Sequence, residues 1–194
     1  MFRIPKIQVA VKLCGFDGSV TRGSLFIDPA SPRHGGPQTI LERLNGPEPF
    51  LVLGVGEGEQ IEIFQKRHLL RVTPMADTAM DQVFVPEGLV TRQEDVTLTL
   101  VNGSTMHGRI WMGLPHDRSR LSDFLNAGEE FFPLLIPGGI HLVRTDAVVK
   151  AVPLAPAPTG EEVTKEDWVA LHGTFRESFE HAGGIVRPGL PRTP

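Results

Sequence analysis

The chain has 194 residues, of which 40% are hydrophobic and 22% charged, and its formal net charge is -4 at pH 7. This composition is typical of an ordinary soluble globular protein, and the acidic balance argues against a general binder of polyanions. The single cysteine, Cys14, excludes an intramolecular disulfide. We expect it to be a buried thiol, because it falls in the first predicted strand.

The start of the chain reads as a β-strand. Ile7, Val9, Val11 and Leu13 alternate with more polar residues, and no continuous apolar stretch of the kind found in signal peptides is present. No apolar run elsewhere approaches the length needed to cross a bilayer. We therefore expect a cytoplasmic protein that makes no membrane contact.

Two parts of the chain carry the same residue pattern, separated by roughly eighty residues. Gly18 and Gly23 are spaced as Gly103 and Gly108 are, and a proline closes each part. The matching segments are FDGSVTRGSLF (16–26) and VNGSTMHGRIW (101–111), TILERLN (39–45) and RLSDFLN (120–126), FLVL (50–53) and FFPL (131–134), and IEIFQKRHLLRVTP (61–74) and IHLVRTDAVVKAVP (140–153). We interpret the pattern as an internal duplication.

Each repeat is predicted to begin as a bent hairpin. Asp17-Gly18 and its counterpart at 102–103 accept the positive φ of a tight turn, and Gly23 and Gly108 mark a bend or a close backbone approach inside the second strand. The short helical segments should end at asparagines that tolerate the left-handed conformation, Asn45 and Asn126. The predicted strands are 7–14, 19–27, 50–54, 60–66 and 68–73, and then 95–101, 105–113, 131–136, 140–144 and 147–152.

This strand pattern resembles the Sm-like family. LVNGSTMHGRI (100–110) is similar to the first Sm motif of the family's bacterial RNA chaperones, and VRTDAVVKAVP (143–153) is similar to the second motif with its closing proline. The resemblance implies a five-stranded open barrel in each repeat. The expected fold is therefore all-β with a C-terminal helix: two tandem Sm-like or SH3-like small barrels related by internal duplication.

The resemblance also implies a possible RNA site. In the bacterial family members the second motif presents a lysine and a histidine to uridine-rich RNA, and the aligned positions here are Lys66 and Arg67 in the first repeat and Thr145 and Asp146 in the second. Lys66, Arg67 and His68 keep the basic character. The competing interpretation is an exposed turn whose charges have no partner, and the absence of tyrosine from the chain disfavours a surface for stacking bases.

No pattern typical of catalysis, a cofactor or a metal site is evident. GVGEG (54–58) is followed by a strand-like segment, where a nucleotide-binding loop would require a helix. His107, His116 and Asp117 lack the spacing of metal ligands, and Ser104 lies in a turn that is no nucleophile elbow. We therefore expect a protein that is not an enzyme and that has no cofactor, no metal and no catalytic residues.

The expected organisation has six parts. The segment between the repeats is too apolar for a free linker, and we predict that it is a crossover with one strand at Val83 to Val85. The Pro/Ala stretch after the second repeat should act as a spacer. The boundaries are 1–74 for the first barrel repeat, 75–94 for the crossover, 95–154 for the second barrel repeat, 155–163 for the spacer, 164–183 for an amphipathic helix and 184–194 for the tail.

The predicted C-terminal helix has one apolar stripe, formed by Trp168, Leu171, Phe175 and Phe179. The stripe either packs on its own barrels or docks on another protein or a second molecule. The favoured function is a non-enzymatic protein-interaction or scaffold protein in which this stripe binds the partner. The alternatives are an Sm-like RNA-binding protein, and a small-ligand binder or enzyme with its site at the seam between the barrels.

Overall fold

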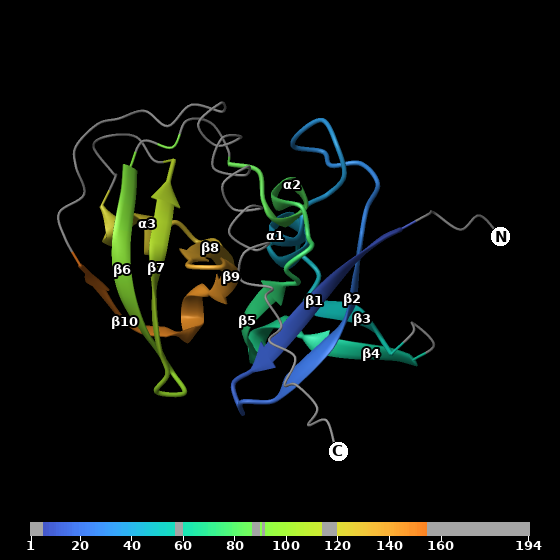
Figure 1. Ribbon diagram of the computed structural model, residues 1–194, viewed down its shortest axis with the longest axis horizontal. Helices are drawn as coiled ribbons and strands as arrows, with labels where there is room; N and C mark the ends of the chain where they lie inside the picture. The colour runs from blue at the N-terminus through green and yellow to red at the C-terminus, as the bar shows by residue number, and fades with distance from the viewer. Residues whose placement is uncertain (1–5, 57–59, 87–89, 91, 114–119, 155–194) are drawn as a thin grey trace, which may run out of the picture.

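The computed structural model describes residues 6–56, 60–86, 90, 92–113 and 120–154. The protein is mostly β-structure, and its ten strands form one antiparallel sheet in the order β10-β6-β7-β8-β9-β5-β1-β2-β3-β4 (Figure 1). No helix among the described residues is long and apolar enough to cross a membrane.

The first repeat supplies half of the sheet. Its elements are β1 (Ile7–Gly15), β2 (Val20–Ile27), α1 (Ile40–Leu44), β3 (Phe50–Val55), β4 (Gln60–Gln65), the 3-10 turn η1 (Lys66–His68) and β5 (Leu69–Pro74). The second repeat supplies β6 (Arg92–Leu100), β7 (Thr105–Met112), α3 (Leu121–Leu125), β8 (Phe131–Ile136), β9 (Gly139–Arg144), the 3-10 turn η3 (Thr145–Ala147) and β10 (Val148–Pro153). The ten strand positions predicted from the sequence are confirmed to within a few residues.

The two repeats order their strands in the same way. The first runs β5-β1-β2-β3-β4 across the sheet and the second runs β10-β6-β7-β8-β9. The two sets join where β5 pairs antiparallel with β9. This junction, which we call the seam, makes one sheet from the two repeats.

The crossover contains a helix where a strand was predicted. The short helix α2 (Met80–Val83) precedes an extended residue, Phe84, and the prediction of a strand at Val83 to Val85 is wrong. Val83 and Phe84 are buried against the apolar cluster of the first repeat, close to α1 (Figure 1). Packing of these two side chains, without strand pairing, therefore removes the apolar run from water.

The turn glycines behave as the sequence predicts, whereas the asparagines do not. Gly18 and Gly103 have φ of 81° and 80° in the two hairpin turns. Asn45 and Asn126 do end α1 and α3, but with φ of -87° and -91° they are not left-handed. The expected αL stop is wrong: the N–H of each asparagine still donates the ordinary helical hydrogen bond to the carbonyl four residues earlier, Leu41 or Ser122.

The apolar core crosses the seam. The cluster built around the first repeat includes Phe131, Ile140 and Leu142 of the second repeat. The cluster of the second repeat includes Cys14 and Leu70 of the first, so the cysteine is buried as predicted. Each repeat therefore completes the core of the other, and burial of these shared apolar side chains stabilises the association of the two repeats.

The bend glycines give the first prediction. A Cβ on Gly23 would lie 2.4 Å from the Gly54 carbonyl oxygen, and one on Gly108 would lie 2.5 Å from that of Leu135. Either Gly→Ala substitution should lower the free energy of unfolding by about 2 kcal/mol or more, because backbone must move to admit the methyl group. Urea denaturation measures the loss.

Gly35→Ala is the matched control, since a Cβ there meets nothing within 4 Å. Its stability should stay within about 0.5 kcal/mol of the unchanged protein. Equal stability of all three variants would show that the close approach of these strands is not a constraint.

Candidate functional site

The seam is a short strand pairing reinforced by polar side chains from both repeats. Arg71 pairs with Val143 and Val72 with Leu142. Beside this pairing the Thr73 hydroxyl oxygen lies 2.9 Å from Nδ1 of His141. Because few main-chain bonds join the two strands, side chains must supply much of the seam's specificity.

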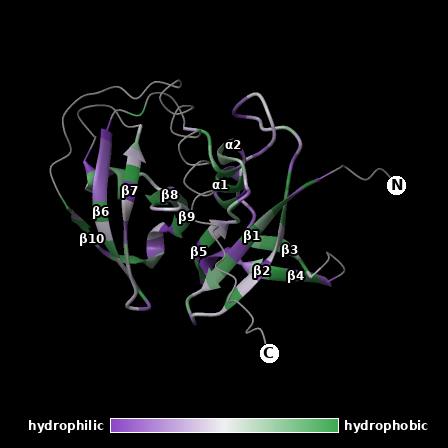
Figure 2. Ribbon diagram, viewed as in Figure 1, coloured by the Kyte–Doolittle hydropathy of each residue, from purple (hydrophilic) through white to green (hydrophobic). Residues whose placement is uncertain are grey.

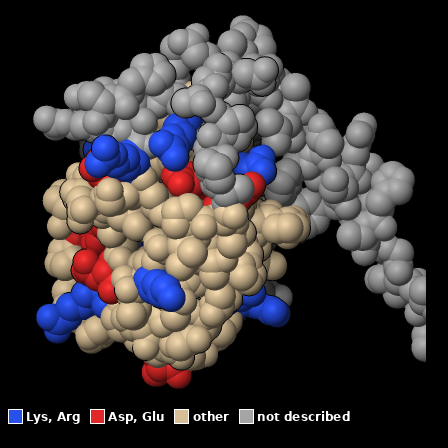
Figure 3. Space-filling model, turned by 90° about the vertical axis from the view of Figure 1, so that its left-hand side faces the viewer, with Lys and Arg blue, Asp and Glu red and all other residues tan. Residues whose placement is uncertain are grey.

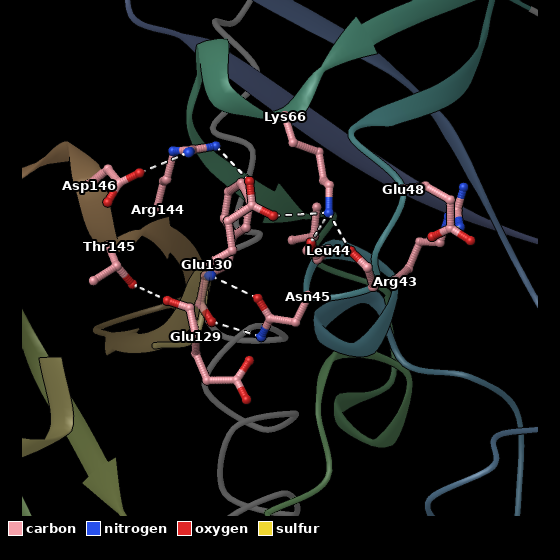
Figure 4. Close-up of polar contacts among 12 residues, drawn as sticks. Arg43, Leu44, Asn45, Glu48, Lys66, Glu129, Glu130, Arg144, Thr145 and Asp146 are labelled. Atoms are coloured by element: carbon pink, nitrogen blue, oxygen red, sulfur yellow. Dashed lines mark hydrogen bonds and ion pairs between the residues drawn. The ribbon is translucent and has the colours of Figure 1, made fainter. Parts of the chain in front are cut away.

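The most buried polar group at the seam is the ammonium group of Lys66, in η1. The residue is only 2% exposed. Its Nζ donates to the carbonyl oxygens of Leu44 at 2.8 Å and Gly46 at 2.6 Å, and forms an ion pair at 2.9 Å with Glu130 of the second repeat (Figure 4). All three donor directions are thus used within the protein.

Glu130 is shared between two cations. Arg144, in β9, donates from Nη1 to Glu130 at 2.7 Å and from Nη2 to Asp146 at 2.9 Å (Figure 4). Its guanidinium lies 5.9 Å from the centre of the Phe131 ring. Lys66, Glu130 and Arg144 form what we call the seam cluster, in which the charge of each member is balanced by a neighbour.

A third contact at the seam comes from the end of α1. The Asn45 side chain donates from Nδ2 to the Phe131 carbonyl at 2.9 Å and accepts from the Phe131 N–H at 2.8 Å (Figure 4). The amide therefore satisfies both main-chain groups of one residue in the other repeat. We call this pair of hydrogen bonds the asparagine clamp.

The environment of His141 opposes its protonation. Burial, together with the positive charges of Arg71 and Lys12, lowers the pKa of His141 from 6.5 to about 4. The imidazole beside Thr73 is therefore neutral at physiological pH.

The outer strands of the sheet, β4 and β10, are its open edges. Within the described residues β4 pairs only with β3, and β10 only with β6. Both edges carry exposed apolar side chains: Ile61 is 52% exposed, Ile63 66% and Val149 66%. Figure 2 shows hydrophobic residues along β4 and its neighbour β3. Unpaired main-chain groups beside apolar side chains are the features of a surface that accepts another strand.

The face that carries β6 and β10 has few charges. Figure 3 shows Lys, Arg, Asp and Glu scattered over it with broad uncharged areas between them. Charges of both signs are present on this face, whereas a surface for nucleic acid is typically a continuous basic one.

A cavity of about 550 Å³ lies between the repeats. Phe84, Trp111 and Phe131 contribute to its lining, together with the His34–Glu42 pair, whose Nε2 and Oε2 are 3.1 Å apart. Burial raises the pKa of Glu42, but the Ser31 hydroxyl, the Thr39 N–H and His34 outweigh it and hold that pKa below its usual range. The indole N–H of Trp111 is buried and has no hydrogen-bond partner among the described residues.

The binding residues predicted from the sequence lie in different environments. Lys66 is buried and its ammonium group is used at the seam, whereas Arg67 and His68 are exposed on the same turn. Thr145, at the position equivalent to Lys66, donates its hydroxyl to the Glu129 carbonyl at 2.7 Å. RNA contact by this turn stays a prediction. The predicted partner-binding stripe of Trp168, Leu171, Phe175 and Phe179 lies outside the described residues.

Sequence reasoning missed Glu130, Arg144 and the asparagine clamp. The first two lie at positions where the repeats differ, so the duplication gives no signal for them. The clamp did leave a signal, because Asn45 precedes Phe50 by the same interval that separates Asn126 from Phe131. That interval suggested only a helix end followed by a strand.

The second prediction concerns Lys66. Lys66→Met should lower the free energy of unfolding by about 2–4 kcal/mol, because Glu130 loses a cation and two carbonyl oxygens lose their donor. Arg67→Met, on the exposed part of the same turn, is the control and should change the stability by less than about 0.5 kcal/mol. Equal stabilities in urea would mean that the Lys66 ammonium group does not hold the seam.

The third prediction concerns pH. Between about pH 6.5 and about pH 4 the unfolded chain binds the His141 proton and the folded protein does not. The free energy of unfolding should therefore fall as the pH is lowered through this range. His141→Gln should remove this contribution, so its curve should be flatter than that of the unchanged protein. Parallel curves for the two proteins would contradict a depressed pKa at His141.

The described residues contain no group of three or more His, Cys, Asp or Glu side chains that could hold a metal ion. No protein-family model matches the chain, and no curated protein or solved structure matches it at a significant level.

Proposed function

We propose that this chain is a non-enzymatic interaction or scaffold protein, built from two small barrels that arose by duplication and share one sheet. The single observation that carries the proposal is the pair of open edges, β4 and β10, with their exposed apolar residues. The conspicuous features of the chain are thus surfaces for other polypeptides.

Strand addition is the mode of binding that these edges favour. An added strand would gain main-chain hydrogen bonds from the edge, while its side chains pack on the exposed apolar residues of β4 or β10. Ile61 and Ile63 lie on the same face of β4, since side chains two residues apart point the same way. They would provide one continuous apolar strip for the partner. The apolar stripe proposed at Trp168 to Phe179 would be a further contact for a partner.

The test is photo-crosslinking in the cells that make the protein. Ile63→p-benzoylphenylalanine on β4 and Val149→p-benzoylphenylalanine on β10 should each give covalent adducts with a polypeptide. Val20 and Val101, which are 56% and 48% exposed, are the control positions and should give far fewer adducts. The readout is the mass of each adduct in denaturing gels, with its composition from mass spectrometry.

Three results would weigh against the proposal. Absence of polypeptide adducts at both edges would remove its basis, and so would equal yields at the edge and control positions. If the same crosslinking residue, placed at position 67 or 68, gave adducts with RNA while the edges gave no polypeptide adducts, the Sm-like RNA-binding alternative would be favoured.

The cavity between the repeats supports a second candidate, the binding of a small ligand. Its favouring observation is the size and lining of the cavity, about 550 Å³ with Phe84, Trp111 and Phe131 in its wall. A mostly apolar molecule would fit such a site. This candidate requires a ligand-dependent change in Trp111 fluorescence that is lost in Trp111→Phe.

A further inference from the structure

The two repeats place equivalent strands in different situations. β9 and β4 are equivalent six-residue strands, and so are β5 and β10. At the seam β5 pairs with β9, whereas β4 and β10 are left as the two ends of the sheet. The molecule thus contains one completed junction and the two separate halves of another.

Residues that are buried at the seam are exposed at the edges. Ile140 and Leu142, the second and fourth residues of β9, are 5% and 0% exposed and belong to the core of the first repeat. Their equivalents in β4 are Ile61 and Ile63, which are 52% and 66% exposed. The side chains are apolar in both strands, but only β9 has a partner strand to bury them.

The complementary strands show the same difference. Leu70, the second residue of β5, is 1% exposed and belongs to the core of the second repeat. Its equivalent in β10 is Val149, which is 66% exposed. Each open edge therefore keeps the apolar residue that the seam would bury in the neighbouring repeat.

A second asparagine and a second phenylalanine are equivalent to the two residues of the asparagine clamp. Asn126 ends α3 as Asn45 ends α1, with almost the same backbone angles. Phe50 begins β3 as Phe131 begins β8. Asn126 and Phe50 are both exposed, whereas at the seam Asn45 is half-buried and Phe131 is buried.

We propose that the chain assembles with further copies of itself, with β10 of one molecule pairing antiparallel with β4 of the next. The register of the seam, transferred to this junction, pairs Lys150 with Phe64 and Ala151 with Ile63. Asn126 of the first molecule then clamps the main chain of Phe50 in the second. This inference rests on the proposed function and names the partner of the edges as a second molecule.

One molecule cannot close this junction on its own. β4 and β10 lie at opposite ends of the ten-stranded sheet, so pairing between them within one chain would require the sheet to close (Figure 1). The contact uses two different surfaces and is therefore heterologous. Repetition of such a contact gives a ring if the rotation closes and a filament if it does not.

The test compares edge variants of the full purified chain by sedimentation velocity. The unchanged protein should form species larger than a dimer. Ile63→Lys on β4 and Val149→Lys on β10 should each be unable to extend the assembly and should be monomeric. Val101→Lys, at a comparably exposed apolar residue in a turn, should assemble as the unchanged protein does.

Mixing the two edge variants tests the pairing itself. Ile63→Lys keeps an intact β10 and Val149→Lys keeps an intact β4, so the mixture should form a dimer of one molecule of each kind and nothing larger. If Ile63→Lys is not folded by circular dichroism, Ile61→Lys replaces it on the same face of β4.

The clamp has its own pair of variants. Asn126→Ala should weaken association by about tenfold or more, since two hydrogen bonds to Phe50 are lost. Ser122→Ala, at an exposed position of the same helix, should leave association unchanged. If the two variants associate equally well, the proposed clamp between Asn126 and Phe50 of the next molecule is wrong.

A monomeric unchanged protein at ~100 µM, or a variant mixture that stays monomeric, would overturn self-assembly; the concentration is chosen to detect even weak dimers. If the edges nevertheless give adducts with other polypeptides in cells, the proposed function stands and only the identity of the partner is wrong. If they give no adducts, both proposals fail.

Discussion

The pairing of β5 with β9 is the interaction on which the rest of the structure depends. Without it the sheet would be two separate sets of five strands, each with a gap in its core. Ile140 and Leu142 fill the gap in the first repeat, and Leu70 and Cys14 help to fill that in the second. A small domain buries too little surface to be very stable alone, so two repeats that share apolar residues gain more from joining than from folding separately.

Polar groups at the seam determine how the repeats join. Apolar side chains alone would accept a strand in more than one register, because the hydrophobic effect has no direction. The Lys66 ammonium group is 2% exposed and must keep its carboxylate and two carbonyl partners, since burial of an unpaired charge is strongly unfavourable. The asparagine clamp adds a second requirement, at the main-chain groups of Phe131. Together these groups allow one arrangement.

Strand positions could be predicted because they depend on local patterns. Alternation along β1 and the turn glycines Gly18 and Gly103 act within a few residues, and the duplication allowed each repeat to support the interpretation of the other. The seam could not be predicted in this way. Glu130 reaches Lys66 across two repeats, and nothing in the sequence near Glu130 indicates a distant partner. The crossover was misjudged because a short apolar run reads alike whether it pairs as a strand or packs as a helix end.

Divergence between the repeats keeps the seam distinct from the open edges. Lys66 corresponds to Thr145 and Glu130 to Pro49, so the charged members of the seam cluster have no equivalents at β10 and β4. If β10 replaced β5 beside β9, Glu130 would lose the Lys66 ammonium group and keep only Arg144 as its cation, so the junction would be weaker. If β5 of a second molecule approached β4, Lys66 would meet Pro49 and lose its carboxylate. The seam cluster therefore favours pairing of β5 with β9 within the chain and disfavours the two wrong combinations. Discrimination of this kind needs an unfavourable alternative as well as a favourable contact. The edges β4 and β10 lack the seam cluster but keep exposed apolar residues, and Asn126 and Phe50 are the equivalents of the clamp residues, which supports the proposed junction between molecules.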